Sequence, residues 1–156
     1  MAYILEWFGI PIDTEEAITG TGLVRVVTEG CNREILQTLF PEAVLTTEEM
    51  LSEETLVNAL SWADAAGIGP GLSTGEAAEK ELACVLTQAK IPLVLDADAL
   101  NILSKHPDWL KKGDTPKILT PHMGEMVRLS GHSMAEPFYR TLPGNHSLVK
   151  SCLFTE

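Results

Sequence analysis

The chain has 156 residues, 45% of them hydrophobic, which suits one domain, or part of a larger one, with a buried core and excludes disorder as the default. Its formal net charge of −11, from 22 acidic and 11 basic residues, would repel a phosphate backbone, so nucleic acid is not expected as a partner. Three widely spaced cysteines, Cys31, Cys84 and Cys152, lack any CxxC pairing, which favours reduced thiols in a cytoplasmic protein over a disulfide framework or a zinc site.

The first part of the chain predicts one strand and one short helix. Residues 1–12 are apolar but too short to span a bilayer, and they lack the basic stretch of a secretory signal, so no membrane is expected as a partner. The β-branched run Leu23–Thr28 predicts a strand. Asn32 predicts the N-cap of a helix that ends at Pro41. The apolar face of this helix is expected to contain Ile35, Leu36, Leu39 and Phe40.

Two strands and a helix follow. Ala43–Leu45 predicts a short strand, and Glu48–Ser61 contains a helix. The expected apolar stripe of this helix is Leu56, Val57 and Leu60. Ala63–Ile68 predicts the next strand, which leads into the glycine-rich loop Gly69–Gly71.

A longer helix is predicted after the glycine loop. Ser73 and Glu76 have capping-box spacing, in which the hydroxyl and the carboxylate each bond an amide of the first turn. A Glu76–Lys80 pair supports the same helix. Its expected buried face is Ala78, Leu82, Val85, Leu86 and Ala89. Pro92 breaks it and leads into a strand at Leu93–Leu95.

The remaining signals complete an alternating pattern. Residues 98–104 predict a helix that ends at His106, Lys117–Leu119 a strand, and Glu125–Leu129 the start of a helix. From residue 132 onward the periodicity is lost, and only 147–154 suggests another element. Alternation of strands and helices predicts an α/β fold, a parallel sheet flanked by helices.

Each of three predicted strands ends in small or polar residues, and parallel strands would bring these ends to one edge of the sheet. The glycines of 67–71 let the backbone approach a ligand closely and direct helix-end amides toward an anion. An ordinary strand-to-helix turn explains the same glycines. The spacing matches neither GxGxxG nor a P-loop.

Asp96 and Asp98 follow the strand that ends at Leu95. Period-two spacing would place both carboxylates on one side of an extended strand end, where they could bind a hydrated magnesium ion or accept protons from ligand hydroxyls. The alternative is that Asp98 caps the following helix and Asp96 makes turn hydrogen bonds.

His122 and Glu125 follow the last strand and could face the same crevice. A histidine there can hydrogen-bond an amide or phosphate, or carry a proton near neutral pH. No third metal ligand is evident, so no metal site is predicted here. The alternative is a surface histidine beside an N-capping Thr120.

The strings GIGPGLSTGE, LVLDADALN and ILTPHMGEM, in this order and spacing, resemble the NAD(P)H-hydrate dehydratase family, a carbohydrate-kinase-like group with a ribokinase-type fold. The resemblance covers about 20–131, so we expect one partial domain over 1–156, an incomplete three-layer α/β/α fold with atypical ends. The family typically has glycine at Ser73 and proline at Met123.

The resemblance implies a hydro-lyase that repairs nicotinamide cofactors. The family removes water from the S-epimer of hydrated NADH or NADPH at the expense of ADP, or ATP, with magnesium. It implies that Gly71 and His122 contact the hydrated cofactor. It also implies that the crevice is lined, or its magnesium and water organised, by Asp96, Asp98, Asn101 and Glu125.

The family's lysine-glycine nucleotide segment and its Gly-x-Gly-Asp motif, which carries the catalytic base, have no counterpart in this sequence. No catalytic residue is therefore assigned, and catalysis by this chain alone is not expected. The alternatives are a small-molecule kinase of the same fold, acting on a vitamin precursor or sugar, and an inactive truncated fragment. An incomplete sheet would expose an apolar face, so the isolated chain is expected to be marginally stable, or to associate as a homo-oligomer or with a complementary fragment.

Overall fold

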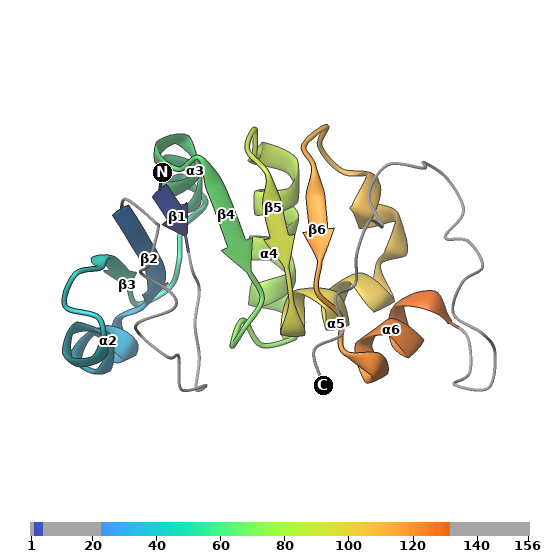
Figure 1. Cartoon of the computed structure of the whole chain (residues 1–156), viewed down its shortest axis with the longest axis horizontal. Helices are drawn as coiled ribbons and strands as arrows, with labels where there is room; N and C mark the ends of the chain where they lie inside the picture. Colours follow the sequence, from blue (N-terminus) through green and yellow to red (C-terminus); the bar gives the residue numbers. More distant parts are fainter. Residues whose placement is uncertain (1, 5–22, 132–156) are drawn as a thin grey trace.

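The computed structural model describes residues 2–4 and 23–131. Six strands of these residues form one sheet in the order β3-β2-β1-β4-β5-β6, and every neighbouring pair is parallel (Figure 1). The predicted α/β class with a parallel sheet is therefore confirmed. The strands are β1 (Ala2–Ile4), β2 (Leu23–Glu29), β3 (Val44–Glu48), β4 (Ala65–Ile68), β5 (Leu93–Leu95) and β6 (Lys117–Leu119).

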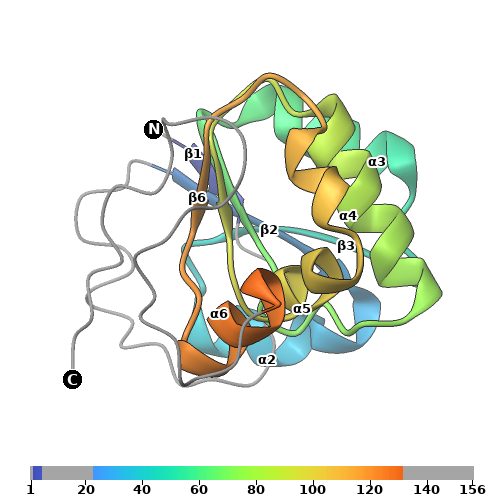
Figure 2. The same ribbon diagram turned by 90° about the vertical axis from the view of Figure 1, so that its right-hand side faces the viewer.

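Helices lie beside the sheet and at one end of its strands. Figure 2 shows α3 and α4 on one side of the sheet, and Figure 1 shows α5 and α6 near the carboxyl ends of β5 and β6. Within the described residues, no helix is long and apolar enough to cross a membrane. The helical elements are η1 (Gly30–Asn32), α2 (Arg33–Leu39), α3 (Glu53–Trp62), α4 (Glu76–Gln88), α5 (Ala97–Lys105), η2 (Pro107–Lys111) and α6 (Met123–Ser130).

Strand β1 was not predicted from the sequence, yet it lies in the middle of the sheet. It pairs with β2 on one side and with β4 on the other. Successive strands therefore run outward in opposite directions, β1 to β3 one way and β4 to β6 the other. In open parallel sheets such a reversal opens a crevice at the carboxyl ends of the strands, where ligands bind.

The core lies between the sheet and α3, α4 and α5. Leu93 and Leu95 of β5 are fully buried, and Ile68 of β4 aligns with Leu95 on the same face. The predicted inner face of α4 is confirmed, because its members are at most 5% exposed: Ala78, Leu82, Val85, Leu86 and Ala89. At about 1.5–3 kcal/mol for each buried large apolar side chain, this layer supplies most of the driving force for folding.

Two predicted helix faces need correction. In α2 only Leu36 is buried, whereas Ile35 and Leu39 are 59% and 54% exposed. Asn32 precedes α2, but its side chain is turned inward and donates a hydrogen bond to Thr28 Oγ1 at 2.8 Å instead of capping the helix.

Helix α3 begins after Ser52, whose hydroxyl caps the helix by accepting a hydrogen bond from the Thr55 amide. Val57 is exposed, and the buried stripe of this helix is Leu56, Ala59 and Leu60.

The opposite face of β4, β5 and β6 carries no helix among the described residues (Figure 1). The register places Gly67, Val94 and Ile118 in one row across these strands. Val94 is 38% exposed and Ile118 is 53% exposed. Strands of a parallel sheet are ordinarily covered on both faces, so this apolar row is a surface that a further layer would ordinarily cover.

Lys117, the first residue of β6, is a buried cation in this sheet. Its side chain is 5% exposed, and Nζ donates to the carbonyl oxygens of Gly113 and Thr115 at 3.3 and 3.2 Å. Burial lowers the pKa of Lys117, and the nearby charge of Asp114 opposes that shift only in part. The charged form is therefore less favourable here than in water.

Replacing Lys117 by methionine tests whether burial of the charged lysine destabilises the fold, because the effect changes with pH. A lysine whose folded pKa is lowered binds its proton more tightly in the unfolded chain, so stability rises as pH increases toward the ordinary lysine pKa of about 10.4. We expect this rise in the native chain and a flatter profile in Lys117→Met, measured by urea denaturation from about pH 8 to pH 10. Lys80→Met is the matched control: Glu76 raises the pKa of Lys80, so its contribution changes only above about pH 10.4 and this profile should run parallel to that of the native chain. Parallel profiles for the native chain and Lys117→Met would contradict the burial effect.

Candidate functional site at the carboxyl edge of the sheet

The three predicted strand-end motifs lie at one edge of the sheet. Ile68, Leu95 and Leu119, the last residues of β4, β5 and β6, are in register. The main-chain pairing continues one residue further, since the Asp96 amide donates to the Ile68 carbonyl at 3.2 Å and the Thr120 amide to the Leu95 carbonyl at 3.1 Å. The loops that follow these strands therefore form a continuous rim, as the sequence predicted.

Gly69 allows the first of these loops to lie directly on the second. A Cβ atom at Gly69 would lie 1.8 Å from the carbonyl oxygen of Asp96, and φ of Gly69 is +136°. The Leu72 amide donates to the Gly69 carbonyl at 3.0 Å, and Gly71 has φ of +72°, so the loop turns back on itself. Glycine is required at Gly69 for contact between two segments of backbone.

Substituting Gly69 tests that contact. In Gly69→Ala the new methyl group meets main-chain atoms, so we expect a loss of about 3 kcal/mol in the free energy of unfolding by chemical denaturation. Gly131→Ala is the matched control, because Gly131 also has positive φ, +66°, but a Cβ there would meet nothing within 4 Å. Its loss should be only about 1 kcal/mol. Equal losses in the two variants would contradict the proposed role of the Gly69 contact.

Ser73 does not form the predicted capping box with Glu76. Helix α4 begins after Gly75, and Ser73 is an exposed residue with φ of +70°. Its amide donates to Oδ2 of Asp98 at 2.9 Å, and its hydroxyl accepts a bond from the Gly75 amide at 3.3 Å. The prediction was wrong because Asp98, which is distant in sequence, bonds this turn. The Glu76–Lys80 pair is confirmed at 2.8 Å, on an exposed surface.

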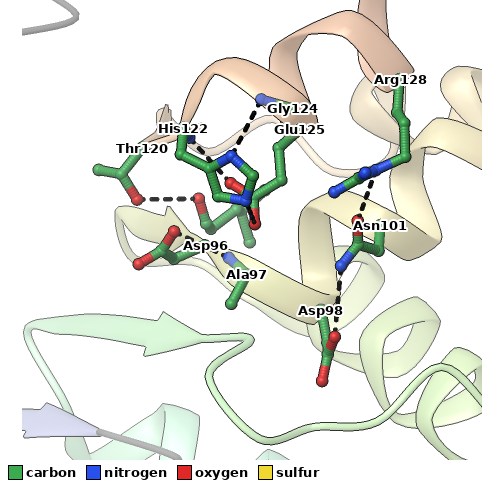
Figure 3. Close-up of polar contacts among 10 residues, drawn as sticks. Asp96, Ala97, Asp98, Asn101, Thr120, His122, Gly124, Glu125 and Arg128 are labelled. Carbon is green, nitrogen blue, oxygen red and sulfur yellow. Dashed lines mark hydrogen bonds and ion pairs between the residues drawn. The ribbon is translucent and has the colours of Figure 1, made fainter. Parts of the chain in front are cut away.

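Asp96 and Asp98 do not share one side of an extended strand. Strand β5 ends at Leu95, and the chain turns at Ala97, which has φ of +46°. Asp96 is the N-cap of α5 and accepts a bond from the Ala97 amide at 2.8 Å, whereas Asp98 belongs to the first turn of the helix. The two carboxylates point in different directions (Figure 3). The shared-side arrangement is therefore wrong. Of the alternative, the turn hydrogen bond of Asp96 is confirmed, but Asp96 rather than Asp98 caps the helix.

Asp98 is linked to α6 through two further side chains (Figure 3). Its Oδ1 accepts a hydrogen bond from Asn101 Nδ2 at 3.3 Å, and Asn101 Oδ1 accepts one from Arg128 Nε at 3.0 Å. The sequence analysis missed Arg128. The available signal was weak: Arg128 stands one turn after Glu125 on a helix that begins at the rim.

His122 and Glu125 form a capping box at the start of α6. Nδ1 of His122 accepts a bond from the Gly124 amide at 3.0 Å, and Oε2 of Glu125 accepts one from the His122 amide at 2.9 Å. Glu125 is 5% exposed, whereas the His122 side chain is 67% exposed. Thr120, which was considered as the cap, instead contributes its hydroxyl to the Leu95 carbonyl at 3.4 Å.

The cap fixes the chemistry available to His122. Because Nδ1 accepts a backbone hydrogen, the proton of the neutral ring must lie on Nε2, which is 3.3 Å from Glu125 Oε1. While the cap holds, Nδ1 cannot take a proton from a ligand. His122 can therefore contact a ligand with its exposed ring and its Nε2–H, but it is not placed to act as a proton acceptor.

Metal-binding groups and free thiols are the two other kinds of chemistry to consider within the described ranges. Residues 2–4 and 23–131 contain no group of three or more histidine, cysteine, aspartate or glutamate residues that could hold a metal ion. Cys31 and Cys84 are both free thiols, and burial raises the pKa of Cys84, with a smaller contribution from the charge of Glu53. A raised pKa disfavours the nucleophilic thiolate.

A parallel sheet with a glycine loop, an aspartate turn and a histidine-capped helix along one rim places this chain among ribokinase-like α/β proteins. A ribokinase-like superfamily protein of Enterococcus faecalis V583 superposes with a TM-score of 0.66 at 28% identity, covering 83% of this chain and 47% of that one. The model of the carbohydrate-kinase family described as NAD(P)H-hydrate dehydratase matches residues 16–149, and the chain belongs to this family.

Characterised relatives carry the same description. The chain is 43% identical over 117 residues to the bifunctional NAD(P)H-hydrate repair enzyme of Escherichia coli K12, covering 75% of this chain and 21% of that protein. It is 35% identical over 135 residues to the ADP-dependent (S)-NAD(P)H-hydrate dehydratase of Lactiplantibacillus plantarum, covering 85% and 46%. The crystal structure of the Bacillus subtilis ADP/ATP-dependent NAD(P)H-hydrate dehydratase, co-crystallised with ATP/Mg²⁺ and soaked with CoA, superposes with a TM-score of 0.56 at 26% identity, covering 83% and 48%.

The chain spans about half the length of the Lactiplantibacillus relative and of the solved structures that it matches. The sequence analysis placed the resemblance at about 20–131. The family match covers 16–149 and so extends beyond that range at both ends.

Proposed function

We propose that this chain supplies the substrate side of an ADP-dependent (S)-NAD(P)H-hydrate dehydratase, a hydro-lyase of nicotinamide cofactor repair. The observation that carries the proposal is the shared rim: the glycine loop, the Asp96 turn and the His122 cap follow three strands in register. Family membership supplies the reaction, because the family model and a similar relative are named for it. The free thiols of the described cysteines are compatible with a cytoplasmic location, which we include in the proposal.

The rim residues have two kinds of role in this proposal. Gly71 and His122 contact the hydrated dinucleotide, Gly71 through a main chain that carries no side chain and His122 through its exposed ring. Asp96 and Glu125 hold the turns that present these groups, since each accepts a hydrogen bond from a main-chain amide at the start of a helix. Asp98 and Asn101 support the glycine loop.

The nucleotide and magnesium belong to another part of the fold in this proposal. In the family's reaction ADP, or ATP, phosphorylates the added hydroxyl group, so that phosphate leaves and the dihydropyridine ring is restored. Among the described residues Asp96 and Asp98 point apart and no group of three or more acidic, histidine or cysteine side chains gathers, so these residues do not fit a magnesium ion. We therefore assign no step to magnesium here.

Substitution of His122 tests the rim as a binding site. His122→Asn retains an N-cap for α6 but removes the ring, so we expect an unchanged melting temperature and at least about tenfold weaker binding of (S)-NADPH hydrate, followed by NMR titration. Lys111→Ala is the control, since Lys111 is exposed and its ion pair among the described residues is with Asp108 on η2. With ADP added, recovery of the absorbance of reduced nicotinamide reports any catalysis by the chain itself.

Each alternative gives a different result in these assays. Absence of hydrate binding by the native chain would favour the inactive fragment. Phosphorylation of a vitamin precursor or a sugar, with no binding of the hydrate, would favour the small-molecule kinase. Equal binding by the native chain and His122→Asn would remove His122 from the proposed contact set.

The bare face of the sheet is the second part of the proposal. The E. faecalis and B. subtilis structures are matched over only about half of their length, so their remaining residues have no counterpart in this match. A parallel sheet needs cover on both faces, and the exposed row contains Val94 and Ile118. We assign this face to a polypeptide that carries the remaining part of the family fold.

Sedimentation velocity tests that assignment. The chain is run alone and with the separately produced part of the L. plantarum relative that lies outside the matched region. We expect a one-to-one complex that Ile118→Glu abolishes and that Glu81→Gln, at a half-buried position on α4, leaves unchanged. Self-association that Ile118→Glu removes would identify a second copy as the occupant, and an unaltered monomer in every mixture would contradict the assignment.

A further inference from the structure

Three hydrogen bonds connect α6 to the glycine loop across α5. Arg128 Nε donates to Asn101 Oδ1 at 3.0 Å, Asn101 Nδ2 donates to Asp98 Oδ1 at 3.3 Å, and the Ser73 amide donates to Asp98 Oδ2 at 2.9 Å. We propose that Arg128 is a positioning residue: it orients the Asn101 amide and, through Asp98, holds the glycine loop at the rim. The consequence of this role of Arg128 for ligand binding rests on the proposed function. The effect of Arg128 on the glycine loop does not.

Arg128 and Asp98 both favour the same orientation of the Asn101 amide and hold it at its two ends. An asparagine side chain has an acceptor end and a donor end of similar shape, and rotation by 180° exchanges them. Arginine has only donors, so Asn101 must turn its oxygen toward Arg128 and its nitrogen toward Asp98. Without the guanidinium, Asp98 would still select the nitrogen end, but the oxygen end of Asn101 would be released. The side chain could then turn away from Asp98, which weakens the bond between them.

Asp98 in turn compensates strain in the loop. Ser73 has φ of +70°, a conformation that an L-residue other than glycine adopts at a cost in energy. The bond from its amide to an ionised carboxylate is of the stronger, charge-assisted kind. This bond holds Ser73 in place, and Gly71 stands two residues earlier on the same loop. A relaxed Ser73 would therefore shift the main chain that the proposed ligand meets.

Other contacts hold the loop independently, so the effect should be local. The Leu72 amide bonds the Gly69 carbonyl within the loop at 3.0 Å. Lys105 Nζ, at the end of α5, lies 3.4 Å from the Thr74 carbonyl. Neither contact involves Arg128. Loss of the guanidinium should free the Ser73 amide while the fold and the Leu72 amide remain as they are.

Amide hydrogen exchange of the full chain, followed by NMR, tests the chain of bonds. In Arg128→Ala and in Asn101→Ala we expect the Ser73 amide to exchange at least about tenfold faster, with Leu72 exchange and the urea midpoint unchanged. Arg128→Lys, which retains a donor and the charge, should restore part of the protection. The double variant should exchange no faster than Asn101→Ala alone, because both changes interrupt one path.

Asn101→Asp distinguishes two explanations. Arg128 either holds the Ser73 amide through Asn101 and Asp98, or it only attaches α6 to α5. The new carboxylate still pairs with Arg128 but faces Asp98 with a second negative group, so Ser73 should lose protection as in Asn101→Ala. Protection of Ser73 that survives Arg128→Ala, or that Asn101→Asp leaves intact, would overturn the proposal.

Binding of NADPH as a probe ligand then distinguishes positioning from direct contact. If Arg128 acts through Asn101, Arg128→Ala weakens binding several-fold in the native background and adds nothing in the Asn101→Ala background. A further loss in that background would show that Arg128 contacts the ligand directly and would overturn its role as a positioning residue alone. Absence of NADPH binding by the native chain would count against the proposed function, whereas the exchange of Ser73 would still decide whether Arg128 holds the loop.

Discussion

The close contact between the backbones of Gly69 and Asp96 determines the shape of the rim. A parallel sheet brings strand ends to one edge, but it does not bring the following loops together. Here the loop after β4 lies on the turn after β5 because no side chain separates them at Gly69. Asp98, in the first turn of α5, can consequently accept a hydrogen bond from the Ser73 amide. This bond joins the loop after β4 to the helix after β5.

The acidic composition of the chain restricts how it can hold the anionic dinucleotide that we propose as its ligand. With a net charge of −11, attraction must come from local groups rather than from the overall field. The capping interactions help, because Asp96, Asp98 and Glu125 direct their carboxylate oxygens at main-chain amides and at Asn101. Their negative charges are thereby partly balanced within the rim, and the exposed ring of His122 remains available to a ligand.

The sequence predicted those features that depend on local pattern. The inner face of α4 follows from helical periodicity, and the parallel sheet follows from the alternation of elements. The features that were missed depend on contacts between segments distant in sequence. Strand β1 has three residues and pairs with two strands that lie far from it along the chain. Ser73 was assigned to a capping box because spacing alone cannot reveal Asp98 as a partner 25 residues away. No sequence motif indicates the role of Arg128, because that role depends on a hydrogen bond to Asn101, 27 residues away.

The two faces of the sheet imply a division of work between this chain and the rest of the family fold. On one face Leu82, Leu86 and Leu93 are fully buried under α4, so this layer has a core of its own. On the other face Ile118 is left half exposed. In the proposed function the described rim residues orient and contact a ligand, yet they gather no metal-binding group and the cap occupies the acceptor nitrogen of His122. Under the proposed function, the described residues position the substrate, and we assign the chemistry to the part of the family fold that covers the second face.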